Sequence, residues 1–220
     1  MAKPILTLKQ KDLLEQLFSQ IDIFSRFHLT GGTALAEYYL RHRYSEDLDF
    51  FSETEVDPLA IQVILKKITP ALEIKKIDFQ QSYNRSLFFL HFEDEVIKTE
   101  FTYFPFSEIE KPHKVGHVLI ESLIDIAVNK TFTIYQNPRS RDFIDLYLIL
   151  QKKLWKFDDL LKKARIKFDT HIDPLQLGQQ LLQATELKDY PRMLYKTDHK
   201  VWQNFWLEEA KRLKNKALTK

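Results

Sequence analysis

Two glycines stand side by side in a chain that contains only four, and their surroundings constrain the fold more than any other feature does. Gly31 and Gly32 follow "HLT", which has the character of a short strand, and they precede "TALAEYYL", which has that of a helix with Thr33 as its N-cap. Glycine allows positive φ and close approach to the backbone, and a helix N-terminus presents free N–H groups to an anion. The order strand, Gly-Gly, helix is therefore typical of a turn that approaches a phosphate. A tight turn that simply needs glycine is the alternative.

A pair of aspartates follows fifteen residues after Gly32, within the apolar segment "SEDLDFFS". Residues two apart in a strand project to the same face, so Asp47 and Asp49 are expected to point together while Leu48 and Phe50 enter a core. Neighbouring carboxylates repel each other unless a cation joins them, and Mg²⁺ binds through one or two carboxylates plus substrate phosphates. The pattern favours a Mg²⁺ or Mn²⁺ site. An exposed strand face or a turn would be the simpler interpretation of a lone Asp-x-Asp.

Hydrophobic periodicity divides the chain into an α/β part, residues 1–112, and a mainly helical part, residues 113–220. In the first part we predict helices over 7–26 and from Pro58 onward with Asp57 as cap, and three successive strands between residues 72 and 104. In the second part we predict helices over 121–136, 140–153, 157–168 and 199–217. No flexible linker separates the parts, so they are expected to pack into one unit.

Composition excludes several classes of protein. The chain has no cysteine, which rules out disulfides and thiolate metal sites. It has no run of about 18 apolar residues, so no transmembrane helix is expected. The N-terminal residues lack the features of a secretory signal, and we expect a cytoplasmic protein. The net charge of +2 is too small to indicate a partner.

The segment "GGTALA…RHRYSEDLDFFS" closely resembles the signature of the polymerase-β-like nucleotidyltransferase superfamily, in which a Gly-Gly or Gly-Ser turn and a helix precede Asp-x-Asp on a strand. With "LIDIAVNKTFTIYQNPRSRDFIDLYLIL", it most resembles the AbiEii/AbiGii toxin family, the enzyme half of a toxin–antitoxin system. The resemblance implies an α/β core with a mixed sheet, followed by a helical half that completes the active site. It covers roughly residues 28–150.

The resemblance also assigns roles in the first half. Gly31, Gly32 and Thr33 would hold the triphosphate of the nucleotide. Arg43 would contact phosphates and Ser45 would hydrogen-bond near the metal, because "RYSEDLD" matches the family pattern. A surface position is the alternative for both of these residues.

A third carboxylate usually joins the aspartate pair in this superfamily, and here the candidate metal ligand beside Asp47 and Asp49 is Glu100. Strand alternation puts Glu100 on the same face as Lys98 and Thr102. The family more often has Asp at this place. The alternative is an exposed strand glutamate that pairs with Lys98.

In the helical half, the resemblance implies that Lys130 contacts the nucleotide phosphates, with Arg139 and Arg141 also binding the nucleotide. Asp142 and Asp145 share one helical face and would orient Lys130 and an arginine, or act as base. We favour orientation, because a carboxylate that faces Lys or Arg has a lowered pKa and is a weak base. The alternatives are a lysine that reaches solvent from its helix, a capping role for Asp142, and simple pairing of Arg141 with Asp145.

The leading hypothesis is metal-dependent transfer of a nucleoside monophosphate from an NTP to an acceptor hydroxyl. The resemblance implies an RNA acceptor, such as a tRNA 3′ end, a toxic effect through blocked translation, and an antitoxin protein as partner. Two alternatives stay open: a catalytically weak or inactive module that binds nucleotide or antitoxin, and a nucleotidyltransferase that modifies a small molecule.

Overall fold

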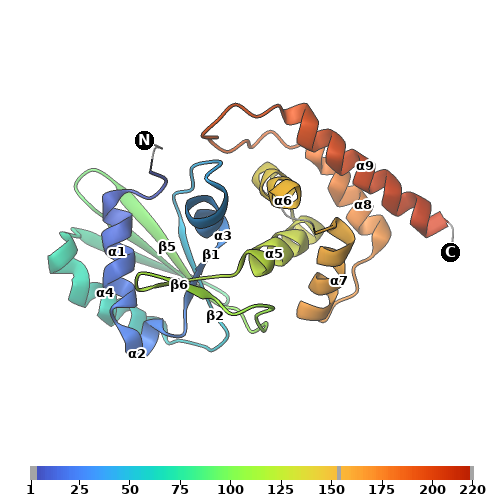
Figure 1. The fold of residues 1–220 in the computed structure, drawn as a ribbon. Helices are drawn as coiled ribbons and strands as arrows, with labels where there is room; N and C mark the ends of the chain where they lie inside the picture. The colour runs from blue at the N-terminus through green and yellow to red at the C-terminus, as the bar shows by residue number, and fades with distance from the viewer. Residues whose placement is uncertain (1–3, 153–154, 219–220) are drawn as a thin grey trace. The chain divides into compact units, whose positions relative to one another are not determined.

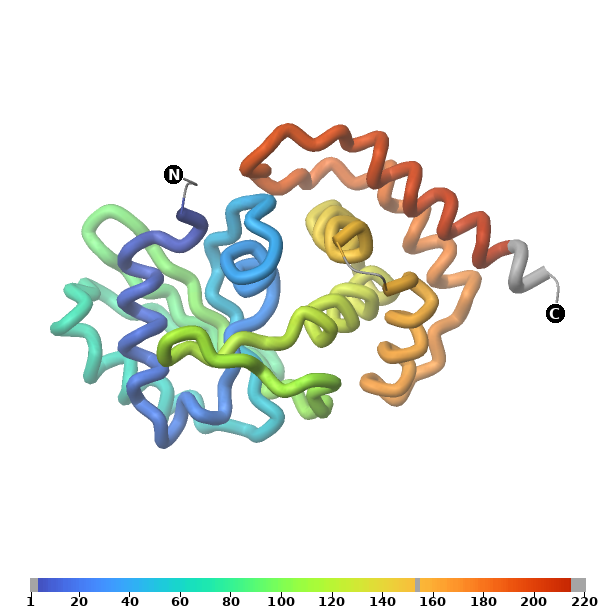
Figure 2. Tube along the Cα trace, in the orientation of Figure 1, coloured from blue at the N-terminus to red at the C-terminus, as the bar shows by residue number. Residues whose placement is uncertain are grey.

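The computed structural model describes residues 4–152 and 155–218. The chain divides into two compact units, Met1–Ser122 and Leu123–Lys220, each of which has its own core (Figures 1 and 2). The first unit is built on a sheet and the second is helical, which confirms the predicted α/β class and the predicted order of its parts.

A mixed seven-stranded sheet with the order β3-β4-β5-β2-β1-β7-β6 forms the frame of the first unit. The strands are β1 His28–Thr30, β2 Leu48–Ser52, β3 Lys76–Ser82, β4 Arg85–His91, β5 Val96–Tyr103, β6 His113–Val115 and β7 Val118–Ile120. The central strands fix the register that matters for function, because β1 pairs antiparallel with β2 and β2 pairs parallel with β5. Thr30 lies opposite Asp49, which lies opposite Glu100, so these three residues form one row across the sheet.

Aromatic rings fill the core on one face of this sheet. Phe50 of β2 stacks on Phe101 of β5 with their centroids 4.8 Å apart. Phe18 of helix α1 (Leu8–Phe18) and Phe24 of α2 (Ile21–Phe24) pack edge-on or tilted against this pair. The alternation of β2 follows directly, because Leu48 and Phe50 are buried here and Asp49 must face the other side.

The prediction of a single helix over residues 7–26 is wrong, because the structure has two helices there. The chain leaves helical geometry at Gln20, between α1 and α2. In one continuous helix Ile21 would share the buried face of Leu17 and Phe18, whereas it is 70% exposed. The break instead lets Phe24 and Phe27 turn into the core, where both are buried.

Helix α4, Pro58–Leu72, begins as predicted. The Asp57 side chain accepts a hydrogen bond from Leu59 N at 2.9 Å, and Pro58 occupies the first helical position, where a missing N–H costs nothing. Two strands that the sequence did not predict follow residue 112: β6 and β7 extend the sheet beside β1. The first unit therefore continues to Ser122.

The second unit consists of helices α5 Leu123–Gln136, α6 Ser140–Lys152, α7 Phe157–Lys167, α8 Pro174–Leu182 and α9 His199–Leu218, with a short 3₁₀ turn over Gln183–Thr185. Four of these agree with the predicted helices, whereas α8 was not predicted. Trp206 of α9 anchors the core: it is fully buried, its ring packs edge-on against Phe157, and its indole N–H donates to the carbonyl of Phe143 at 3.1 Å.

Candidate active site

The glycine pair begins the helix that follows β1. The helical segment starts at Gly31 as α3, Gly31–Ala34, and continues as a π-helical stretch, Leu35–Leu40. Thr33 is therefore not the N-cap, which corrects the prediction. Thr33 is the third residue of the helical segment, is fully buried, and its hydroxyl donates to the carbonyl of Asp47 at 2.5 Å. This bond ties the glycine turn to the aspartate strand.

Each glycine is explained by the group that lies against it. Gly31 has φ +70°, and a Cβ there would lie 2.6 Å from Oδ2 of Asp49. At Gly32 a Cβ would meet the guanidinium of Arg43 and would lie 3.0 Å from Oγ of Ser45. The pair thus leaves room for three of the predicted site residues. The turn, Asp49, Arg43 and Ser45 therefore lie together in one cluster.

Asp47 and Asp49 flank buried Leu48 and are both partly accessible. Asp47 stands just before β2 and Asp49 within it, so the expected alternation of apolar and acidic residues is present. Lys98 of β5 donates to Oδ2 of Asp47 at 2.9 Å. An ammonium group therefore compensates one of the two carboxylates.

Glu100 is held by an arginine that the sequence did not single out. Arg85 of β4 donates from Nε and Nη2 to the two carboxylate oxygens, each at 2.5 Å. These hydrogen bonds raise the pKa of the Arg85 guanidinium, and the nearby Asp49 carboxylate adds to the effect. Lys98 lies farther away, with Nζ 3.9 Å from Glu100, and Thr102 donates to Glu100 at 3.2 Å. Glu100 is thus on the predicted face but is buried, and its main partner is Arg85 rather than Lys98.

A further buried carboxylate beside the glycine turn was missed in the sequence. Glu121 is 2% exposed, accepts a hydrogen bond from the Thr30 hydroxyl, and lies 3.8 Å from Nε2 of His28. The hydroxyl of Tyr39 donates to the Glu121 carbonyl at 2.6 Å. Sequence reasoning read this segment as the start of a helix, so the contact with β1 was not foreseen.

In the second unit, the predicted lysine and two aspartates meet. Nζ of Lys130 lies 3.0 Å from Oδ1 of Asp142 and 2.8 Å from Oδ2 of Asp145, and all three residues are buried. Lys130 therefore does not reach solvent from its helix. Asp142 also accepts a hydrogen bond from the Arg139 backbone N–H at 3.2 Å, so it also satisfies a backbone donor at the start of α6.

The two arginines of this segment lie outside that contact. The Arg139 side chain is more than half exposed and its Nε lies 3.8 Å from Asp142. Arg141 is half-buried, and the ammonium group 2.8 Å from Oδ2 of Asp145 is that of Lys130.

Neither a metal cluster nor a membrane helix is found in residues 4–152 and 155–218. No three His, Asp or Glu side chains there are grouped so as to hold a metal ion. No helix in this part of the chain has the length and apolarity needed to cross a membrane.

Comparison with known proteins identifies the family. The model of the family described as "Nucleotidyl transferase AbiEii toxin, Type IV TA system" matches residues 12–205. An uncharacterized protein of Aquifex aeolicus is 31% identical over 162 residues, which cover 73% of this chain and 74% of that protein.

Two solved structures have a similar fold. JHP933 from Helicobacter pylori has a TM-score of 0.61 at 17% identity, with 95% of this chain and 92% of that one covered. The nucleotidyltransferase toxin MenT4 from Mycobacterium tuberculosis has a TM-score of 0.59 at 16% identity, with 93% and 81% covered. At such low identity these similarities establish the nucleotidyltransferase fold.

Proposed function

Because this chain belongs to the AbiEii family of nucleotidyltransferase toxins, we propose that it transfers a nucleoside monophosphate from an NTP to a hydroxyl of RNA, such as a tRNA 3′ end. The observation that carries this proposal is the packing of Asp49 against Gly31, with Asp47 two residues before Asp49 in the chain. This packing puts a backbone turn and two carboxylates at the same place. An antitoxin protein would be the partner that limits the activity.

The donor chemistry of the aspartate pair fits a divalent cation. Asp47 and Asp49 offer hard carboxylate oxygens on the accessible side of β2, which suits Mg²⁺ or Mn²⁺. Glu100 fits less well as it stands, because both of its oxygens accept hydrogen bonds from Arg85. Its role as a third ligand stays a prediction, and we propose Asp47 and Asp49 as the principal pair. The bound cation would supply positive charge to the phosphate and attacking oxygens.

The other residues of the cluster would position the nucleotide. Gly31 and Gly32 let Asp49 and Arg43 pack against the turn where the triphosphate would bind. The buried Thr33 hydroxyl donates to the Asp47 carbonyl and so holds the turn against the strand. In the reaction the acceptor oxygen forms a bond to the α-phosphorus, the bond to the pyrophosphate oxygen breaks, and the hydroxyl proton passes to solvent. The chain would contribute mainly positioning and charge compensation.

The cluster of Lys130, Asp142 and Asp145 supports a positioning role for the two aspartates. Both carboxylates contact the same ammonium group, so each is better suited to holding Lys130 than to accepting a proton. The predicted contacts of Lys130, Arg139 and Arg141 with nucleotide phosphates remain part of the proposal.

The test is incorporation of label from each α-³²P-labelled NTP into total RNA by wild type and Asp49→Asn. We expect the variant to lose label by a factor of at least about 10², with an unchanged thermal unfolding midpoint. Asp12→Asn, on the exposed face of α1, is the matched control and should incorporate normally. Full incorporation by Asp49→Asn would contradict the mechanism. Label in a low-mass product would contradict the RNA acceptor, and NTP-dependent stabilisation without any transfer would indicate a binding module.

A further inference from the structure

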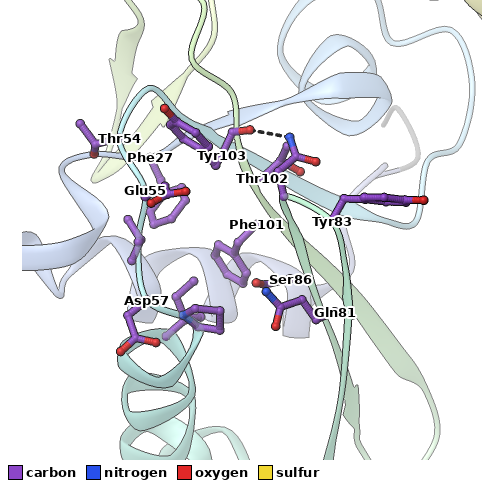
Figure 3. Close-up of a pocket in the computed structure, with 14 residues that line it drawn as sticks. Phe27, Thr54, Glu55, Asp57, Gln81, Tyr83, Ser86, Phe101, Thr102 and Tyr103 are labelled. Carbon is purple, nitrogen blue, oxygen red and sulfur yellow. Dashed lines mark hydrogen bonds between the residues drawn. The ribbon is translucent and has the colours of Figure 1, made fainter.

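A cavity of about 470 Å³ lies in the first unit, and its lining residue Thr102 donates a hydrogen bond to Glu100 of the candidate active site. It is bounded by the loop after β2, the start of α4, the β3–β4 turn and the end of β5 (Figure 3). None of its lining residues belongs to the predicted site. At about 3.3 Å per residue, Ser52 lies roughly 10 Å along β2 from Asp49, and the cavity begins beyond Ser52. Its size is in the range of pockets that bind small organic molecules, roughly 300–1,000 Å³.

The charged side chains of the lining are all negative. Glu55 and Asp57 both line the cavity, and its lining as described contains no Lys, Arg or His. Within the described part of the chain, neither carboxylate forms an ion pair. A ligand that carries positive charge would therefore gain attraction here, whereas a phosphate would be repelled.

The start of α4 does not offer a binding site for a phosphate or another anion in this cavity, because Asp57 already caps the helix. Pro58 has no N–H, and Leu59 N donates to Oδ1 of Asp57 at 2.9 Å. The next two amides, of Ala60 and Ile61, donate to the Asp57 carbonyl. The amides of the first helical turn are thus already used, and the helix N-terminus has no free donor for a phosphate.

Across the cavity from the two acids lie Ser86 and Gln81, with Phe101 between the two sides (Figure 3). Ser86 is 7% exposed, and its hydroxyl has no hydrogen-bond partner among the described residues. Because Ser86 lines the cavity, its hydroxyl can form a hydrogen bond with a ligand there. The rings of Phe27 and Phe101 add an apolar wall that suits a methylene chain or the face of a cation.

We propose that this cavity is a binding site for an organic cation, namely a guanidinium or primary ammonium group on an aliphatic chain. Glu55 and Asp57 compensate the charge, the Ser86 hydroxyl accepts one of the cation's N–H groups, and the chain lies along Phe101. The cation is either a small polyamine-like molecule or the side chain of an arginine in a peptide. The site does not depend on the proposed transfer reaction.

Isothermal titration calorimetry of the full chain at 0.15 M salt tests the site with three probes: agmatine, spermidine and the peptide acetyl-Gly-Arg-Gly-amide. We expect at least one probe to bind, and the same peptide with neutral citrulline in place of arginine to bind at least tenfold more weakly. Tighter binding of agmatine or spermidine supports a free small molecule as the ligand, and tighter binding of the peptide supports a side chain. The absence of binding by all three probes at 10 mM would overturn the proposal.

Two variants localise the binding. Asp57→Asn removes the charge but keeps a good N-cap, and Glu55→Gln changes an exposed side chain, so both variants should keep the wild-type unfolding midpoint. Each should raise the Kd of the bound probe at least fivefold, and Ser86→Ala should raise it as well. Asp12→Asn removes the same charge on α1 and should leave the Kd unchanged. Equal Kd values for wild type, Glu55→Gln and Asp57→Asn would place the cation elsewhere and overturn the proposal.

Discussion

At the scale of single residues, the glycine pair owes its identity to the side chains that lie against it. Gly31 combines a positive φ with the Asp49 carboxylate at contact distance, so two separate constraints exclude any larger residue. Gly178 in α8 differs, because a Cβ there would meet nothing within 4 Å. The same residue type is thus essential in one element and replaceable in another.

Gly31→Ala should lower the free energy of unfolding by about 1–2 kcal/mol from left-handed strain alone, and should reduce nucleotidyl transfer by displacing Asp49. Gly178→Ala is the matched control and should be neutral or stabilising by up to about 1 kcal/mol, because alanine favours a helix interior. Urea unfolding followed by circular dichroism measures both effects. Equal stability of the two variants would contradict the steric account of the turn.

At the scale of elements, register and helix packing decide which charges meet. The β4–β5 ladder places Arg85 opposite Thr102 and thereby within reach of Glu100, two residues back on the same face. Packing of α5 against α6 sets Lys130 between Asp142 and Asp145. In both cases a carboxylate that sequence reasoning read as a possible ligand or base is compensated by a cation from a neighbouring element.

Lys130→Met should destabilise the chain by about 3–5 kcal/mol, since it leaves two buried carboxylates without their cation. The second substitution Asp145→Asn should restore part of this loss, because it removes one of the two unpaired charges. Lys163→Met, on the exposed face of α7, is the control and should change stability little. Urea unfolding of the four proteins checks the series, and a double variant no more stable than Lys130→Met would contradict the charge argument.

At the scale of the whole molecule, two separate ring clusters stabilise the chain. The first gathers Phe50 and Phe101 under the sheet, and the second gathers Phe143, Phe157 and Trp206 among the helices. The clusters share no residue and lie in different compact units. Substitutions in the two clusters should therefore act independently.

Phe50→Leu and Trp206→Phe should each cost about 1–3 kcal/mol, the first from a partly filled cavity and the second from an unpaired Phe143 carbonyl. The double variant should lose the sum of the two within about 0.5 kcal/mol. Chemical denaturation of the single and double variants measures the coupling. A coupling energy well above that margin would show that the two clusters do not act independently.

The sequence by itself determined the features that follow from local rules. The glycine turn, the Asp-x-Asp strand, the cap at Asp57 and four of the second unit's helices depend on the steric limits of glycine, strand alternation and helical periodicity, all of which are legible along the chain. The break at Gln20 and the strands β6 and β7 could not be predicted from such local rules. They depend on the burial of Phe24 and on the edge of β1, which are properties of the assembled sheet.

Only the tertiary structure decided which cation compensates each carboxylate. Lys98 meets Asp47 across 51 residues of sequence, and Arg85 meets Glu100 across 15. Such pairs depend on strand order and register, which a single sequence does not specify because many pairings satisfy the same alternation. The acidic cavity beside α4 arises in the same way, from loops that are distant in sequence and become neighbours when the sheet forms.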